Sequence, residues 1–135
     1  MGLRFDTLDV VEPEPVGDFY AALGAGRGAS RAGFSLAGVP AEPGDDAYGL
    51  TDRAMSALDA DALLIDVEPC ELAGVPAVRT LVLEQLGGLA TVVLEQWRLV
   101  AAGERWVVTA TADLAAWAQL AAGLRAVVAT LEVEA

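Results

Sequence analysis

The sequence predicts an α+β fold, in which an antiparallel β-sheet carries a C-terminal amphipathic helix packed on one face. Two observations support this prediction. Three runs rich in β-forming residues follow one another between Val78 and Thr111, and short glycine-containing breaks separate them. Directly afterwards, apolar residues recur at spacings of three and four, which places them on one helical face. Strands joined by such short breaks pair antiparallel, and a helix with one apolar face buries it against the sheet.

The N-terminal part of the chain gives weaker signals. Residues Leu3–Val11 alternate loosely and are expected to form an opening strand. Pro13 and Pro15 end it, because proline donates no hydrogen bond to a strand ladder. The next segment, Val16–Leu23, fits a short helix or a strand, and its periodicity does not decide between them. Gly24–Gly33 is rich in glycine and is expected to be a loop.

A short helix is expected in the middle of the chain. Before it, Phe34–Val39 is expected to be a short strand and Pro40–Gly49 an acidic loop. Thr51 is the expected N-cap, and Asp52 follows in the first turn, where a negative charge suits the helix dipole. The helix is expected to end near Asp59, with an apolar face made of Ala54, Met55 and Leu58.

The second half of the chain carries the clearest pattern. Ala62–Glu68 is β-like, although its apolar residues 63–65 also suit a longer helix. Pro69 and Gly74–Pro76 frame a turn into the next strand. Further strands are expected over Val78–Gln85, Leu89–Val100 and Arg105–Thr111. The helix is expected over Asp113–Leu131, before a short closing strand, and its face consists of Leu114, Trp117, Ala121, Leu124, Val128 and Leu131.

The run Leu89–Val100 is apolar on both of its faces for most of its length. A half-exposed antiparallel sheet should instead alternate between apolar and polar residues. One helix covers one face, so the second face must meet another surface. Coverage by the N-terminal half of the chain is the leading expectation, because domains tend to close one core. A twin subunit and a partner protein are the alternatives.

Composition indicates a single domain over residues 1–135, with 55% apolar residues and a mean hydropathy of +0.47. The net charge of −12 disfavours a nucleic-acid partner and an anionic membrane surface, because both are bound mainly by basic residues, and neither is expected as a partner. Met1–Thr7 lacks the apolar stretch of a signal peptide, and no run is long and apolar enough to span a membrane. All eight basic residues are arginine, which fits a GC-rich bacterial gene, and a cytoplasmic location is expected.

Residues that carry common catalytic chemistry are scarce. The chain has no histidine and a single cysteine, Cys70, so histidine-based triads, an internal disulfide and cysteine–histidine metal sites are excluded. Glu68 and Glu71 should raise the pKa of the Cys70 thiol, so Cys70 is read as a small apolar strand residue. Gly24–Ala29 resembles a dinucleotide loop without the helix that must follow it. Asp59–Asp61 begins like a calcium loop that leucines then interrupt. No catalytic, metal-binding or cofactor-binding residue is therefore expected.

Tryptophan is the residue type of greatest functional interest here. Trp97 and Trp106 are expected to face each other across a hairpin, and Trp117 to lie on the helix face. Core packing is the leading interpretation, because tryptophan buries a large apolar area. The alternative is that one of them anchors a partner, as tryptophan often does in interfaces. The candidate partner-binding residues are Trp97, Arg98, Leu99 and Trp106.

The C-terminal half, Pro69–Glu134, resembles the PsbP-like, or DcrB-like, α+β fold. The resemblance rests on Gly74–Arg79, on a long strand containing Gln96 and Trp97, and on Trp106–Thr111 before a terminal amphipathic helix with a short strand. Members of that fold are mostly not enzymes and include photosystem accessory subunits, a nuclear import factor, bacterial lipoproteins and chaperone-adaptors. The resemblance therefore implies a binding or adaptor role, and no catalytic residue carries over.

The leading functional hypothesis is a non-enzymatic protein-binding or chaperone-adaptor domain, which holds an apolar segment of a partner protein on a sheet face or groove. A small-molecule carrier or enzyme with a pocket between sheet and helix is the second hypothesis. A structural subunit of a larger assembly is the third. A homodimer or a stable hetero-complex is expected rather than a free monomer, because the two-sided strands leave an apolar patch to bury.

Overall fold

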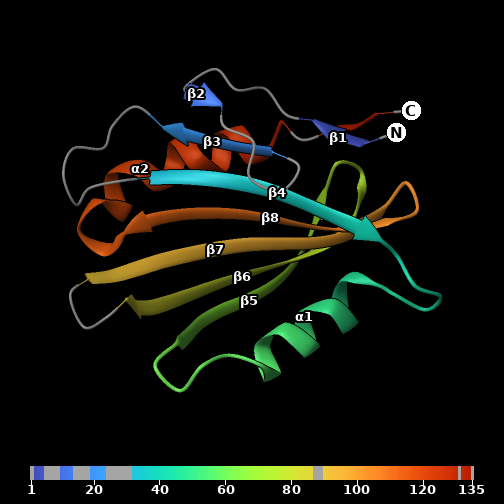
Figure 1. Cartoon of the computed structure of the whole chain (residues 1–135), viewed down its shortest axis with the longest axis horizontal. Coiled ribbons are helices and arrows are strands. Elements are labelled where there is room, and N and C mark those ends of the chain that lie inside the picture. Colours follow the sequence, from blue (N-terminus) through green and yellow to red (C-terminus); the bar gives the residue numbers. More distant parts are fainter. Residues whose placement is uncertain are drawn as a thin grey trace.

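The computed structural model describes residues 2–4, 10–13, 19–23, 32–86, 90–130 and 132–134. These residues form a seven-stranded antiparallel sheet, a separate two-stranded pair and two helices (Figure 1). The predicted α+β class is confirmed. The sheet runs in the order β2-β3-β4-β8-β7-β6-β5. Its strands are β2 (Val10–Pro13), β3 (Phe19–Leu23), β4 (Ala32–Pro40), β5 (Leu63–Leu72), β6 (Val75–Leu86), β7 (Ala90–Ala101) and β8 (Glu104–Asp113).

Two tight turns join neighbouring strands in the second half of the chain. The β5–β6 hairpin turns at Ala73-Gly74, and the β7–β8 hairpin turns at Ala102-Gly103. All four residues have positive φ, between 54° and 78°, as a two-residue type I′ turn requires. The predicted turn around Gly74 is therefore confirmed. The prolines do not frame it, because Pro69 and Pro76 lie within β5 and β6.

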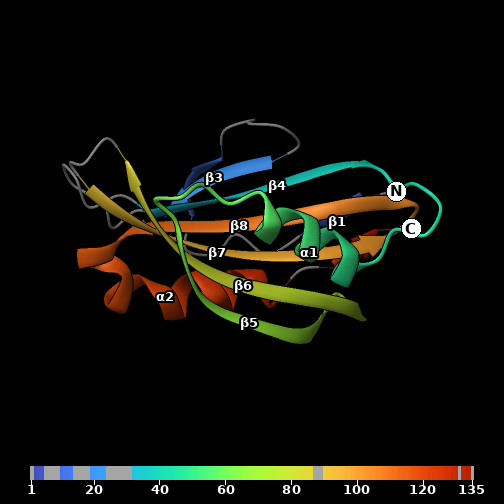
Figure 2. The same cartoon turned by 90° about the horizontal axis from the view of Figure 1, so that it is seen from below.

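The two helices pack on opposite faces of the sheet (Figures 1 and 2). Helix α2 (Leu114–Val128) contacts β4, β7 and β8, and helix α1 (Ala47–Ser56) contacts β6 and β7. Successive residues of a strand point to opposite faces. Glu95, which bonds to α2, and Arg98, which lies near α1, mark these two faces on β7.

The sequence predicts that the N-terminal half covers the second face of the sheet, and this holds only for part of that half. Strands β2, β3 and β4 extend the sheet beyond β8. Helix α1 is the part of this half that packs on the second face, over β6 and β7. The predicted opening strand is also wrong in extent. Gly2–Arg4 forms β1, which pairs with the closing strand β9 (Glu132–Glu134), whereas β2 belongs to the large sheet.

Helix α1 begins four residues before the predicted N-cap. Asp46 caps it, because its Oδ1 accepts a hydrogen bond from the Gly49 amide at 2.7 Å. Thr51 lies inside the helix, where its hydroxyl donates to the Ala47 carbonyl oxygen at 2.8 Å. The prediction that Pro40–Gly49 is entirely loop is therefore wrong at its end. Aspartate and threonine both cap helices, so the sequence alone does not decide between Asp46 and Thr51.

The core lies between the sheet and α2. Leu124 and Val128 of α2 belong to one buried cluster with Leu99 and Val108. The prediction fails at the start of the helix face, where Leu114 is 48% exposed. In the undecided segment before Gly24, the described residues Phe19–Leu23 form strand β3, and residues 16–18 lie outside the described residues. The expected strand over Phe34–Val39 is confirmed within β4. Residues 24–31 of the predicted loop and Leu131 lie outside the described residues.

Candidate functional site

The four candidate partner-binding side chains are all buried. Trp97, Leu99 and Trp106 are 6%, 0% and 4% exposed and share the face under α2. Trp97 pairs with Val108, and Leu99 pairs with Trp106, so the two tryptophans are diagonal neighbours rather than direct partners. Core packing is therefore confirmed for these residues. In this structure their burial leaves a partner little of these four side chains to contact.

Trp106 is held in place by a close approach of β4. Its indole Nε1 donates to the Ala101 carbonyl oxygen at 3.2 Å. Its ring packs on Gly38 of β4, where an added Cβ would lie 2.5 Å from the ring atoms. Because any larger side chain at Gly38 would collide with the ring, this pair explains why the strand carries glycine there.

Exposed apolar side chains instead gather on β5, at one edge of the sheet. Leu63, Leu64, Ile65 and Val67 are 58%, 38%, 49% and 47% exposed, and we call these four the β5 edge patch. The register shifts between Leu64 and Asp66, so Ile65 sits in a β-bulge. Within the described sheet β5 has a neighbour on one side only. An exposed apolar edge strand is a ready template for pairing with another chain.

Strand β5 also carries three acidic residues, of which the first lies within the patch and the others follow it. Asp66 and Glu68 are 48% and 58% exposed at their side chains, and Glu71 is exposed as well. Arg79 of β6 forms ion pairs with both Asp66, at 2.5 Å, and Glu68, at 3.6 Å. Apolar and acidic side chains therefore follow each other along one open edge.

A buried carboxylate lies beneath α2. Glu95 is fully buried and accepts hydrogen bonds from Arg79 at 2.6 Å and from Arg125 at 2.8 Å. Arg125 also lies over the Trp117 ring, at 5.7 Å from its centroid. These contacts join β6, β7 and α2. Their role is structural, because both oxygens of Glu95 are already used by arginines.

Cys70 is half-buried on β5, beside this cluster. Burial raises the pKa of its thiol, and the Glu68 carboxylate raises it further, against an opposing effect of Arg79. The predicted upward shift is confirmed for Glu68, whereas Glu71 does not contribute. A raised pKa leaves little thiolate near neutral pH, which does not suit a nucleophile. In the described part of the chain, no three His, Cys, Asp or Glu side chains gather as metal ligands would.

The β5 edge patch was missed by sequence reasoning. A short apolar run such as 63–65 is usually a buried strand or helix segment, and period alone does not separate these from an exposed edge. The sequence feature that indicates an exposed edge is the presence of Asp66, Glu68 and Pro69 nearby, since charged residues and proline are typical of edge strands.

No protein-family model and no curated protein matches the sequence. Solved structures do match its fold. PA94 from Pseudomonas aeruginosa, a protein of unknown function for which a regulatory role has been suggested, aligns with a TM-score of 0.70 at 19% identity. That alignment covers 86% of this chain and 82% of PA94.

Two further structures align over 98% of this chain. LpqN, which is involved in cell envelope biogenesis of Mycobacterium tuberculosis, gives a TM-score of 0.67 at 13% identity over 83% of its own length. The cyanobacterial PsbP of Synechocystis gives 0.58 at 14% identity over 82% of its length. The chain therefore has a PsbP-like fold, as the sequence resemblance implied. Such low identities show the fold alone. Neither described helix is long and apolar enough to cross a membrane.

Proposed function

We propose that this protein is a non-enzymatic protein-binding or adaptor domain, which holds an extended apolar segment of a partner along β5. The observation that carries the proposal is the β5 edge patch on an open sheet edge. An extended segment can add a strand there, with backbone hydrogen bonds supplying affinity and side-chain contacts supplying specificity. Burying the patch also removes an apolar surface from water.

Charge favours a foreign partner over a second copy of this chain. Each copy carries −12, and the acidic residues Asp66, Glu68 and Glu71 lie on the same strand as the patch. Two such edges would bring like charges together, whereas a segment with apolar and basic residues would complement both the apolar and the acidic side chains of β5. The proposed partner segment is therefore apolar and basic. The PsbP-like fold adds support by analogy only.

A matched pair of peptides tests this proposal. One alternates valine with lysine, and the other alternates valine with glutamate at the same length. Fluorescence anisotropy should show binding of the valine–lysine peptide, with an affinity that falls as salt screens the charges. Equal binding of the two peptides, or no binding of either, would contradict the proposal.

The chain offers a matched control for the binding surface. Leu63→Gln should reduce the affinity for the valine–lysine peptide by about fivefold or more, because burying glutamine is less favourable than burying leucine. Leu114→Gln makes the same change at a similarly exposed leucine on α2 and should leave binding unchanged. Equal losses in the two variants would place the binding surface away from β5.

A further inference from the structure

Arg98 is a buried cation with no carboxylate within ion-pair distance among the described side chains. Its side chain points to the α1 face of β7, and the residue is 7% exposed. Its Nη1 donates to the Thr80 hydroxyl at 3.3 Å, and its Nη2 donates to the Gln96 side-chain oxygen at 2.8 Å. Both partners are neutral. Gln96 in turn donates to Thr109 at 3.1 Å, so a polar row crosses β6, β7 and β8 and fixes the guanidinium.

The other arginines whose side chains are described behave differently. Each of them has a carboxylate within ion-pair distance, namely Arg53 and Arg105 with Asp45, Arg79 with Asp66, Glu68 and Glu95, and Arg125 with Glu95. Among the arginines whose side chains the structure describes, Arg98 alone has none. An unpaired buried charge is costly, and burial lowers the pKa of Arg98 accordingly. A residue kept at that cost is a candidate for binding an anion.

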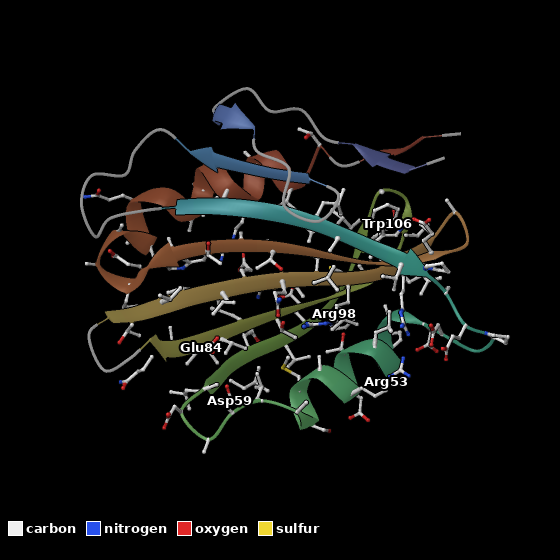
Figure 3. All side chains as sticks on the ribbon, in the orientation of Figure 1. Arg53, Asp59, Glu84, Arg98 and Trp106 are labelled. Carbon is white, nitrogen blue, oxygen red and sulfur yellow. The ribbon has the colours of Figure 1, made fainter. Side chains whose placement is uncertain are left out.

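A pocket adjoins this guanidinium. It has a volume of about 350 Å³ and lies where α1 faces β4, β7 and β8. Figure 3 shows Arg98 on the near side of the sheet, next to α1. A second cation, Arg105, also reaches the pocket but is shared with Asp45 at 3.4 Å. The remaining wall is mostly apolar and is formed by Ala37, Gly38, Val39, Leu50, Ala54 and Val107.

We propose that this pocket binds a small amphipathic monocarboxylate, whose carboxylate pairs with Arg98 and whose apolar body lies against Val39, Leu50 and Val107. A guanidinium has five N–H donors, and the two bonds to Thr80 and Gln96 leave three for a carboxylate. One uncommitted cation suits a single negative charge better than a phosphate dianion. The volume lies at the small end of ligand sites, which span roughly 300–1,000 Å³.

The site is separate from the β5 edge, so the proposal goes beyond the protein-binding function. The β5 edge patch lies on the strand at one end of the sheet order, whereas the pocket involves β4, β7 and β8. A ligand here would contact α1 and leave the open backbone of β5 free. Peptide binding and carboxylate binding can thus be measured, and can fail, independently.

Titration with octanoate and octanol tests the proposal, since the two probes share an apolar chain and differ in charge. Isothermal calorimetry should show octanoate binding at least about tenfold more tightly than octanol, the usual value of one charged hydrogen-bonded contact. Amide NMR shifts should concentrate in α1 and around Arg98. Equal binding of the two probes, or shifts concentrated in α2, would overturn the proposal.

Two substitutions separate the pocket from general effects on folding. Arg98→Gln should reduce octanoate affinity about tenfold and leave octanol affinity unchanged. Ala54→Trp keeps the arginine but fills the pocket, so it should weaken the binding of both octanoate and octanol. Arg53→Gln, at an exposed arginine on the same helix, is the control and should change neither. Octanoate affinity that survives both Arg98→Gln and Ala54→Trp would show that the probe binds elsewhere.

Discussion

The carboxylate of Glu95 joins three elements of the fold. It is fully buried, and its two oxygens accept hydrogen bonds from Arg79 of β6 and Arg125 of α2. Removing one partner of a buried ion pair is strongly destabilising, because the remaining charge loses its compensation. Here Arg125 is half-exposed, so water can take over part of its solvation.

We predict that Glu95→Gln lowers the free energy of unfolding by about 3 kcal/mol, at the lower end of the range for broken buried pairs. Glu84→Gln makes the same change on the neighbouring strand β6, where the carboxylate has no ion pair among the described residues, and should cost less than about 0.5 kcal/mol. Urea melts of both variants measure the difference. Similar losses would show that Glu95 does not anchor α2.

The reactivity of Cys70 reports on its surroundings. Burial, and then the Glu68 carboxylate, raise its thiol pKa above that of an ordinary cysteine. Because the thiolate is the reactive form, alkylation by iodoacetamide should reach its half-maximal rate at a higher pH than for a free cysteine in solution. Glu68→Gln should move that midpoint down, whereas Glu71→Gln, next to Cys70 in sequence, should not. A larger downward shift for Glu71→Gln would contradict the arrangement of β5.

Helix α2 offers two leucines in contrasting environments. Leu124 is completely buried against the sheet, and Leu114 at the start of the helix is 48% exposed. Only the first fills core volume, so only its truncation leaves a cavity. The helix is therefore held on the sheet by its later turns.

We predict that Leu124→Ala costs about 2–5 kcal/mol of unfolding free energy, as buried leucine truncations usually do. Leu114→Ala should stay within about 0.5 kcal/mol of the parent protein. Denaturant melts on the two variants provide the comparison, and each serves as the control of the other. A loss below about 0.5 kcal/mol for Leu124→Ala would place this helix face outside the core.

Two opposed properties govern the behaviour of the whole molecule. The net charge of −12 keeps copies apart, and the β5 edge patch favours their pairing. Salt weakens the first property, because the screening length falls from about 10 Å at 0.1 M to about 3 Å at 1 M. It leaves apolar burial in place.

We therefore predict that self-association grows with salt. Light scattering at micromolar concentration should give 13.9 kDa at low ionic strength and a larger mass at high ionic strength. Leu63→Gln should suppress the increase, and Leu114→Gln should not. A mass of 13.9 kDa at every salt concentration would show that the edge does not pair with itself.

Local patterns determined much of the second half of the fold. Strands β6, β7 and β8 and helix α2 were predicted with small errors at their ends. Hydrophobic periodicity and glycine-containing turns can be recognised within a short stretch of sequence. The burial of Trp97 and Trp106 followed from their size. The lack of histidine and the single cysteine likewise limited the chemistry that the side chains can perform, since composition alone sets which reactive groups the chain carries.

Only the tertiary structure decided which surfaces stay open. Strand β4 pairs with β8, so that Ala32 lies opposite Ala112 although the two are far apart in the sequence. This pairing places the N-terminal strands beyond β8, and β5 lies at the opposite edge of the sheet. Leucines 63 and 64 are exposed for that reason, although their sequence resembles a buried strand. Arg98 became a buried cation in the same way, because α1 packs over its face of β7. Contacts between segments so distant in sequence depend on the packing of the whole chain, which no local period records.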